Sequence, residues 1–257
     1  MDKSHHIEHI VIDLEFNQSY NTKKGDKSET VAECPFEIIQ IGAVKLDENL
    51  DIKDQFTVLI KPQIYPKINP IVERITGITD EILDSCVNFE EAFQLFAKFA
   101  GINSVIYTWG IDDIKSLFRN IVYFKCDTKS ITNRYINIQP IAAKALNSQS
   151  GGTIGLKNAA ELFGIECPLK FHDALNDASY TALILKKIFS ALPEPSVLRP
   201  EDIAPKKKNV RTKFKTKELI EYFENSLERK VTKEETAIIL TAYKLGRKRK
   251  YETKNGE

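Results

Sequence analysis

The chain has 257 residues, of which 42% are hydrophobic, and its 37 Lys and Arg nearly balance its 36 Asp and Glu. This composition excludes a disordered or membranous chain, and no apolar run is long enough to span a bilayer. The length suits one domain with an extension, or two small domains. No secretory signal is seen near Met1, and the four Cys are scattered without a Cys-x-x-Cys pair, so we expect reduced thiols and a cytoplasmic protein.

Charge is unevenly distributed along the chain. From Glu201 onward there are sixteen Lys and Arg against ten acids, whereas residues 1–200 hold 21 against 26. A basic appendage on an acidic body indicates a polyanionic partner, with nucleic acid as the first candidate. The alternative is a solvated, lysine-rich tail that aids solubility, and charge alone does not separate the two.

The first predicted element is a β-strand over residues 9–17, because β-branched and aromatic residues follow one another in a run too short for a helix. Side chains alternate along a strand, so Asp13 and Glu15 point to one side while Leu14 points to the other. Two like charges at the end of a buried strand repel each other, and a divalent cation such as Mg²⁺ or Mn²⁺ would remove that cost. The alternative is a strand end that reaches water, with both carboxylates solvated.

A polar loop over residues 17–35 separates this strand from two further strands at 36–46 and 54–60, which a tight turn at 47–49 connects. Long loops beside a pair of acids are often functional. Gly42 in the second strand predicts a bulge or a close approach of another part of the chain. Three adjacent strands joined in this way predict an antiparallel meander.

Helices and strands alternate after the meander. Short helices are expected between residues 64 and 84, with Thr79 as an N-cap. Asn88 is the predicted N-cap of the next helix, whose apolar stripe is Ala92, Leu95, Phe96 and Phe99. The patterns predict strands at 104–109 and 122–127, and helices at 89–100, 112–120, 139–146, 153–164 and 174–192. This order predicts an α/β fold with a mixed sheet covered by helices.

The last part of the chain differs in composition. Prolines at short intervals, followed by Lys and Arg without an acid until Glu218, predict a linker. Two amphipathic helices are expected after it, at 217–226 and 232–245, and four basic residues then follow at 247–250. The predicted division is therefore a domain over 1–195, a basic linker over 196–217 and a small helical basic tail over 218–257.

A third candidate acid follows the strand at 104–109, in the sequence Trp109-Gly110-Ile111-Asp112-Asp113. In a mixed sheet, sites form where a strand ends and a helix begins. Asp113 is the better candidate, because Ile114 and Leu117 fix the packed face of the helix and leave Asp113 near the strand end. Asp112 fits the role of an acid in the first turn, where the helix dipole favours a negative charge. The alternative is that both acids only mark the start of a helix.

The fourth candidate acid comes with a histidine, in the sequence His172-Asp173-Ala174-Leu175-Asn176-Asp177. Asp177 is expected more than one turn inside an apolar helix, with His172 just before that helix. An imidazole beside a carboxylate-held metal can take a proton from water near neutral pH. Either residue alone is more often structural or solvated, and their joint occurrence favours a site. Phe16 and Trp109 are candidates for stacking a base, with core packing as the alternative.

Taken in order, Asp13-Leu14-Glu15, Asp113 after Trp-Gly, and His172 with Asp177 resemble the three motifs of the DEDDh group of 3′–5′ exonucleases. The resemblance covers roughly residues 7–192 and includes Thr76-Gly77-Ile78-Thr79 and Leu156-Lys157-Asn158-Ala159. It implies an RNase H-like fold, a mixed β-sheet flanked by helices, to which this chain adds a small basic helical C-terminal extension. The Trp-Gly before Asp113 most resembles the KapD-like and histone-mRNA-type branch, which acts mainly on RNA.

The resemblance implies a metal-dependent enzyme that shortens single-stranded nucleic acid from its 3′ end, RNA more readily than DNA, and releases nucleoside 5′-monophosphates. It implies that Asp13, Glu15, Asp113 and Asp177 hold two divalent ions, Mg²⁺ or Mn²⁺, and that His172 is the general base. The candidate substrate-binding residues are Phe16, Ile78 and Trp109.

Alternatives stay open at this point. One is a DNA 3′–5′ exonuclease of repair or proofreading, and another is a nonenzymatic nucleic-acid-binding module, which the loss of an acid or the histidine would have favoured. The basic tail lies outside the resemblance. It is expected either to attract the nucleic-acid backbone in a salt-dependent way or to dock a protein.

Overall fold

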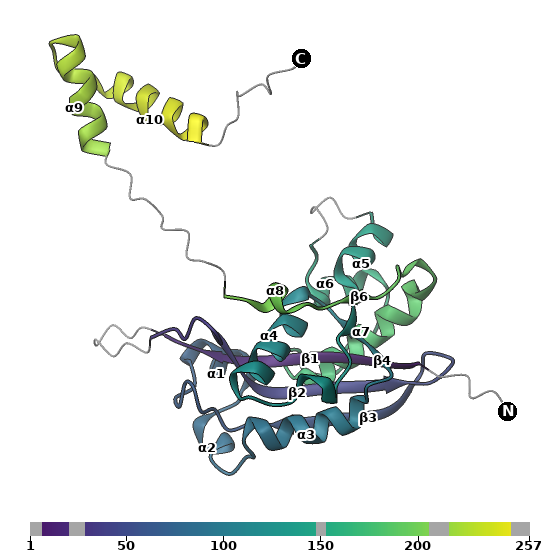
Figure 1. Cartoon of the computed structure of the whole chain (residues 1–257). Coiled ribbons are helices and arrows are strands. Elements are labelled where there is room, and N and C mark those ends of the chain that lie inside the picture. Colours follow the sequence, from purple (N-terminus) through teal and green to yellow (C-terminus); the bar gives the residue numbers. More distant parts are fainter. Residues whose placement is uncertain (1–6, 21–28, 148–152, 206–215, 248–257) are drawn as a thin grey trace. The chain divides into compact units, whose positions relative to one another are not determined.

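The computed structural model forms two compact units, residues 1–205 and residues 206–257, and describes residues 7–20, 29–147, 153–205 and 216–247 (Figure 1). The first unit contains the sheet, and the second contains α9 (Thr216–Leu227) and α10 (Lys233–Arg247). Within the described ranges, no helix combines the length and the hydropathy needed to cross a bilayer. The two tail helices lie within two residues of their predicted bounds.

A six-stranded mixed sheet has the order β3-β2-β1-β4-β5-β6. Antiparallel pairing joins β1 to β2 and β2 to β3, which confirms the predicted meander, while β4 runs parallel to β1 and β5 parallel to β4. The strands are β1 (Glu8–Gln18), β2 (Phe36–Leu46), β3 (Ile52–Leu59), β4 (Ser104–Thr108), β5 (Arg134–Asn137) and β6 (Ser196–Val197). This is the helix-flanked mixed sheet of the RNase H-like class that the sequence predicts.

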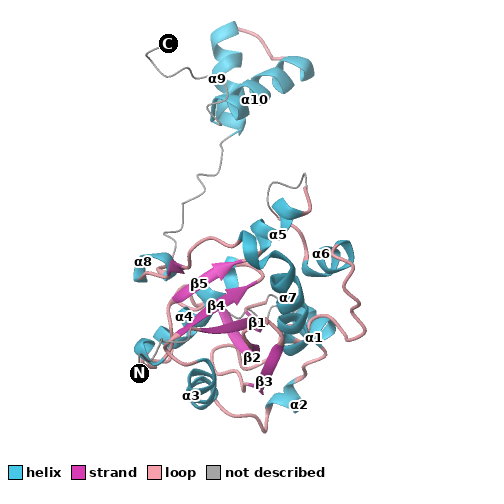
Figure 2. Cartoon of the chain, turned by 90° about the vertical axis from the view of Figure 1, so that its right-hand side faces the viewer, coloured by secondary structure: helices cyan, strands magenta, loops and turns pink. Residues whose placement is uncertain are grey.

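Helices cover both faces of the sheet, with α3 and α4 on one side and α7, α5 and α6 on the other (Figure 2). In the first unit the helices are α1 (Pro70–Thr76), α2 (Asp80–Leu83), α3 (Phe89–Ala100), α4 (Ile111–Tyr123), α5 (Gln139–Ala145), α6 (Leu156–Leu162), α7 (Ala174–Ile188) and α8 (Pro200–Ile203), with 3₁₀ turns η1 (Thr128–Ser130) and η2 (Phe189–Ala191). Each face of the sheet therefore has its own buried apolar cluster.

Alternation along β1 decides which side each residue faces. Ile10, Ile12 and Leu14 belong to the cluster under α3 and α4, whereas Val11 belongs to the cluster under α7. Asp13 and Glu15 continue the series of Val11, so their side chains lie on the α7 side of the sheet. The strand that carries the first two acids is thus anchored by apolar side chains on its opposite face.

Gly42 of β2 marks the point where α7 meets the sheet. A Cβ atom added there would lie 2.1 Å from the backbone carbon of Ala174, so no side chain fits. Of the two predicted explanations, close approach is therefore the correct one. The irregularity in the β1–β2 register falls elsewhere, between Glu15 and Phe16.

Two predicted helix caps are confirmed. The side chain of Thr79 accepts a bond from the Ile82 N–H, and that of Asn88 accepts one from the Glu91 N–H. One member of the predicted α3 stripe is wrong, since Leu95 is 48% exposed while Phe93 is buried. The buried face of α3 is centred on phenylalanines at intervals of three and four, and Leu95 lies at its edge.

The strand predicted over residues 122–127 is wrong, because α4 continues through Tyr123. The helical spacing of Leu117, Phe118 and Ile121, all buried, extends to this end of α4, and Val122 is half exposed to solvent. Strand propensity in Val122-Tyr123-Phe124 was outweighed by this buried face. The strand beside β4 is instead β5, which is short and mostly polar.

The predicted linker begins later than residue 196. Within that stretch, β6 pairs with β5, and the Leu198 N–H donates to the Asn133 carbonyl at 2.9 Å. Arg119 Nε donates to the Ile203 carbonyl at 3.0 Å, which fastens α8 to α4. Residues 196–205 therefore belong to the first compact unit.

Candidate active site

Two of the predicted acids are placed by the central strand and a third by the helix after its neighbour. Ile12 on β1 pairs with Thr108, the last residue of β4, so Asp13 and Glu15 lie beyond the end of β4. The chain then turns through Gly110 into α4, whose third residue is Asp113. Asp112 is exposed, whereas Asp113 is half-buried. The structure thus separates the two neighbouring acids as the sequence predicted.

The fourth acid and the histidine lie at the start of α7. Asp173 is the N-cap, accepting bonds from the Leu175 and Asn176 N–H groups at 3.1 Å each. Asp177 is buried in the first turn, less deep in the helix than predicted. His172 is exposed in the left-handed backbone region, with φ of 63°, and its N–H donates to Asp177 Oδ2 at 3.0 Å.

These groups converge, and we call Asp13, Glu15, Asp113 and Asp177 the acid cluster. Ligand atoms of Glu15, His172 and Asp177 lie within 4.8 Å of one another. The pKa of Asp13 is raised well above its usual range, by burial first and then by the charges of Asp113, Asp177 and Glu15. Four carboxyl groups from three elements therefore share one low-dielectric site.

Repulsion and burial act on every member of the cluster. Burial and the charges of Asp177 and Asp113 raise the pKa of Glu15 to about 8. Burial, then the charge of Asp112, raises the pKa of Asp113 to about 7. Burial also raises the pKa of Asp177, against the N–H bond from His172. Without a cation, the cluster therefore holds protons that ordinary carboxyl groups would have lost at neutral pH.

A divalent metal fits this donor set. Asp177 Oδ1 is buried and has no hydrogen-bond partner among the residues that the structure describes, although its other oxygen accepts from the His172 N–H. A buried carboxylate oxygen without a donor is costly unless a cation completes it. Carboxylate oxygens are the preferred ligands of Mg²⁺ and Mn²⁺, so the residues present suit these ions.

Sequence reasoning missed three polar residues around the cluster. The buried amide of Gln40 accepts from the Ala174 N–H at 3.2 Å and donates to Asp173 at 3.3 Å, which ties β2 to the start of α7. Lys170 Nζ donates to the Thr76 carbonyl at 2.8 Å, and its charge lowers the pKa of Glu15. Asp173 had a usable signal, an N-cap residue type directly before an apolar helix. Gln40 and Lys170 had none.

The three candidate substrate-binding residues differ in placement. The indole of Trp109 is buried in the cluster under α7, and its N–H donates to the Ile154 carbonyl at 3.1 Å, which favours the core alternative. Ile78 is largely buried near Leu83. Phe16 is half-buried, packs against the cluster under α3 and α4, and lies 6.0 Å from the Phe36 ring. Phe16 is thus the most accessible of the three, whereas Ile78 and Trp109 are buried, at 7% and 8% exposed, and Trp109 is a poor candidate for stacking a base.

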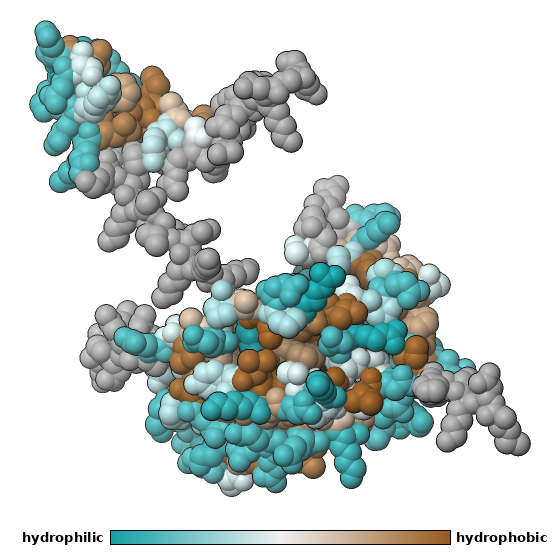
Figure 3. Space-filling model, in the orientation of Figure 1, coloured by the Kyte–Doolittle hydropathy of each residue, from teal (hydrophilic) through white to brown (hydrophobic). Residues whose placement is uncertain are grey.

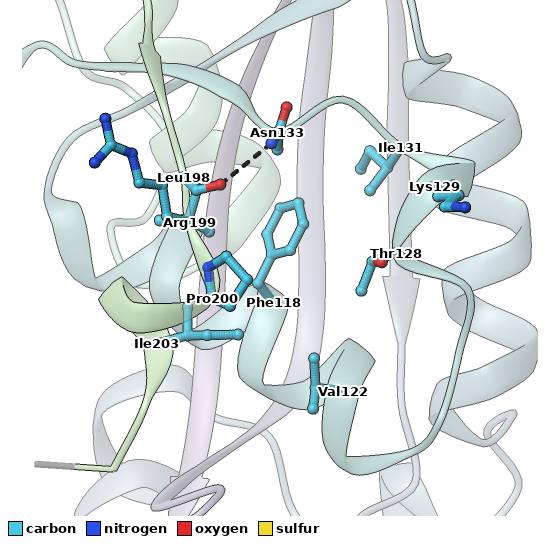
Figure 4. A pocket seen from close by; sticks show the side chains of 10 residues that line it. All are labelled: Phe118, Val122, Thr128, Lys129, Ile131, Asn133, Leu198, Arg199, Pro200 and Ile203. Carbon is cyan, nitrogen blue, oxygen red and sulfur yellow. Dashed lines mark hydrogen bonds between the residues drawn. The ribbon is translucent and has the colours of Figure 1, made fainter.

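A cavity of about 430 Å³ lies between α4, η1 and α8, away from the acid cluster (Figure 4). Its lining is mainly apolar and includes Phe118, Ile131 and Leu198. The charged ends of Lys129 and Arg199 point away from its centre (Figure 4). It therefore lacks the converging charges of a phosphate site, and we place the chemistry at the acid cluster.

Comparison with known proteins identifies relatives. The family model described as Exonuclease, of the RNase T type, matches residues 10–185. The DNA polymerase III subunit epsilon of Aquifex aeolicus (strain VF5) is 30% identical over 156 residues, 61% of this chain and 73% of that protein. The probable 3′–5′ exonuclease KapD of Bacillus subtilis (strain 168) is 28% identical over 149 residues, 55% of this chain and 68% of that protein.

Solved structures share the fold at lower identity. The nuclease domain of 3′hExo, a DEDDh family member bound to rAMP, has a TM-score of 0.61 and 18% identity, covering 77% of this chain and 99% of that one. Exonuclease I of E. coli in complex with a dA16 oligonucleotide has a TM-score of 0.54 and 18% identity, covering 72% and 41%. One similar protein is thus bound to a ribonucleotide and the other to DNA.

Proposed function

Because this chain belongs to the DEDD family of 3′–5′ exonucleases, we propose that its acid cluster cuts single-stranded nucleic acid, RNA in preference to DNA, and releases nucleoside 5′-monophosphates. The observation that carries this proposal is the convergence of four acids and His172 beyond the end of β4. The family match confirms the predicted enzyme, so the nonenzymatic alternative is not kept.

The acid cluster would hold two divalent ions, Mg²⁺ or Mn²⁺. Such ions supply a lowered pKa of the attacking water and stabilisation of the leaving 3′ oxygen. Asp177 would contribute its unpartnered Oδ1, while its other oxygen stays bonded to the His172 N–H. Asp13, whose carboxyl group is close enough for the charges of Asp113, Asp177 and Glu15 to raise its pKa, would be a further ligand.

His172 would take the proton of the attacking water. Its side chain is exposed, and a ring nitrogen lies within 4.8 Å of carboxylate oxygens of Glu15 and Asp177. An imidazole at this position is close to the site without being buried in it, and imidazole groups commonly act as general bases near neutral pH. The backbone bond to Asp177 would orient the histidine and the metal ligand together.

Phe16 would pack against the terminal nucleotide with its exposed edge, and Ile78, which is 7% exposed, would contribute only a small contact. Basic residues at 206–215 and 247–250 would add nonspecific attraction to the phosphate backbone. The RNA preference is supported by the likeness to the nuclease domain of 3′hExo, which is bound to rAMP. The second candidate substrate is DNA, which the 30% identity to a DNA polymerase III subunit favours.

The test is digestion of a 5′-labelled single-stranded RNA and the DNA of the same sequence, each with Mg²⁺, Mn²⁺ or EDTA. We expect a metal-dependent ladder that shortens from the 3′ end and is lost in Asp13→Ala and His172→Ala. Asp112→Ala, an exposed acid one residue from the cluster, is the matched control and should keep the ladder. Faster digestion of DNA would reverse the substrate assignment, and an EDTA-resistant ladder would reject the metal mechanism.

A further inference from the structure

The hairpin of α9 and α10 has an ordered turn but no core. Thr232 and Glu235 cap α10 reciprocally, at 3.1 and 2.8 Å, and Arg229 donates two bonds to Glu235 at 2.9 and 2.7 Å. Nevertheless, none of the described side chains in either helix is buried. Two short helices bury too little apolar surface to be stable alone, so the hairpin needs a further surface to pack against.

One exposed face of α10 is suited to packing against such a surface, and we call this face the α10 stripe. Its members repeat at helical spacing and line a groove of about 410 Å³: Ala237, Ile238, Thr241, Ala242 and Leu245. Ile238 is 68% exposed. Figure 3 shows apolar side chains gathered on one side of the hairpin and polar side chains on the other. The stripe contains no charged residue.

Charge in the tail is segregated from this stripe. Residues 216–247 hold six Lys and Arg and six Glu, so the hairpin is neutral overall. Residues 206–215 hold six Lys and Arg and no acid. Attraction to a polyanion therefore falls on the flanking sequence, and an uncharged apolar stripe on a neutral hairpin does not fit nucleic acid.

We infer that the α10 stripe docks the same stripe of a second copy of this chain, with the two α10 helices antiparallel about a two-fold axis near Thr241. In that register Leu245 lies opposite Ala237 of the partner subunit, and Ile238 lies close to Ala242 of the partner subunit. Large residues thus face small ones in both directions, as a self-complementary interface requires.

Electrostatics favours the same antiparallel register. The first turn of α10 is acidic, with Glu234 and Glu235, while the helix ends at Arg247 and three basic residues follow it in sequence. An antiparallel pair sets each acidic start near the basic end of its partner, and the two helix dipoles then oppose each other. A parallel pair would place like charges together at both ends.

The test is sedimentation equilibrium of the full chain up to tens of micromolar. The wild type should be a dimer, and Ile238→Glu should raise its dissociation constant at least about 30-fold, because the residue lies inside the interface. Tyr222→Glu is the matched control: Tyr222 is 66% exposed on α9 but lies off the stripe, so dimerisation should persist. Both substituted residues are exposed, so neither substitution removes a buried contact within the chain. Circular dichroism should show that Tyr222→Glu keeps its helix content, while Ile238→Glu loses helix only together with the dimer.

A second measurement fixes the register. Thr241→Cys should form an intermolecular disulfide with itself under mild oxidation, faster than the wild-type chain with its four native Cys. A wild type that stays monomeric, or a dimer that Ile238→Glu leaves intact, would overturn the inference. The wild type would stay monomeric if the α10 stripe were covered by the chain's own first unit or by another protein. Exonuclease activity is not needed for either readout, so failure of the proposed function would leave this test decisive.

Discussion

Glu37 and the acid cluster are both buried carboxyl groups of the first compact unit, but their hydrogen bonding differs. Glu37 is 2% exposed, and its carboxylate accepts from the N–H groups of Gln63, Ile64 at 2.7 Å and Tyr65 at 2.8 Å. Burial raises the pKa of Glu37, and these three bonds counteract the shift. Asp177 in the acid cluster, by contrast, has one bonded oxygen and one without a partner.

Hydrogen bonding to the carboxyl oxygens distinguishes the structural acid Glu37 from the acids of the candidate site. Glu37 completes its hydrogen bonds within the chain and fixes the segment after β3, so it needs nothing from outside. The acid cluster lacks enough donors and its members repel one another, so a cation would stabilise it. Burial and a raised pKa are common to both, and the unpartnered oxygen is what separates them.

The largest expected effect is on catalysis at the cluster. Asp13→Asn should lower kcat/KM at least about 10³-fold, because it removes the most central charge that holds the metal. In EDTA at pH 8 the same variant should be as stable as the wild type or more so, since repulsion is relieved. Steady-state assays measure kcat/KM and thermal melts measure stability in EDTA, with Asp112→Asn as the control. A variant that melts earlier in EDTA would mark Asp13 as structural.

Glu37→Gln should show the opposite pattern. Its amide presents an NH₂ group to backbone donors, so we expect a loss of about 2 kcal/mol in the free energy of unfolding. The kcat/KM per folded molecule should change little. Urea unfolding beside Glu48→Gln, an exposed acid in the turn after β2, measures the effect. A Glu37→Gln variant that lost activity while keeping its stability would contradict the structural role of Glu37.

The pH dependence of stability should sharpen the contrast further. In the folded state the pKa of Glu15 is about 8 and that of Asp113 about 7, whereas unfolded carboxyl groups titrate near 4. The folded state thus binds more protons, so this contribution to stability is complete at low pH and is lost as pH rises toward 8. In EDTA, Glu15→Gln should therefore gain stability relative to the wild type between pH 5 and 8.

Adding Mg²⁺ or Mn²⁺ at pH 8 should raise the melting temperature of the wild type by a few degrees, since a ligand that binds the folded state stabilises it. Glu15→Gln should respond less. A melting temperature that changes with neither metal would contradict a metal site at the acid cluster.

The smallest expected effect is at Gln40. Gln40→Met removes the two bonds that tie β2 to Asp173 and Ala174, so we expect a loss of about 1 kcal/mol in stability and a several-fold lower kcat. Gln55→Met, on the exposed part of β3, serves as the control. Unchanged kcat in Gln40→Met would show that α7 is held by Gly42 packing alone.

Local rules are enough to predict from the sequence which side each acid of the candidate site faces. Strand alternation puts Asp13 and Glu15 on one side, and helix periodicity separates Asp113 from Asp112. Contacts between distant residues were invisible: Gln40 and Asp173 lie 133 residues apart, and Glu37 looked like any polar residue of a strand. The 122–127 strand failed for the same reason, since only the packed fold shows that Ile121 continues a buried helical face.

His172 holds its left-handed backbone conformation against the preference of a residue with a Cβ atom, a cost on the order of 1 kcal/mol. Glycine would adopt the same conformation more readily. A glycine at this position would therefore give a chain that melts later but lacks the imidazole proposed above as the proton acceptor. If His172 takes the proton as proposed, His172→Gly would raise the stability of this short loop and remove the activity of the enzyme with the same substitution.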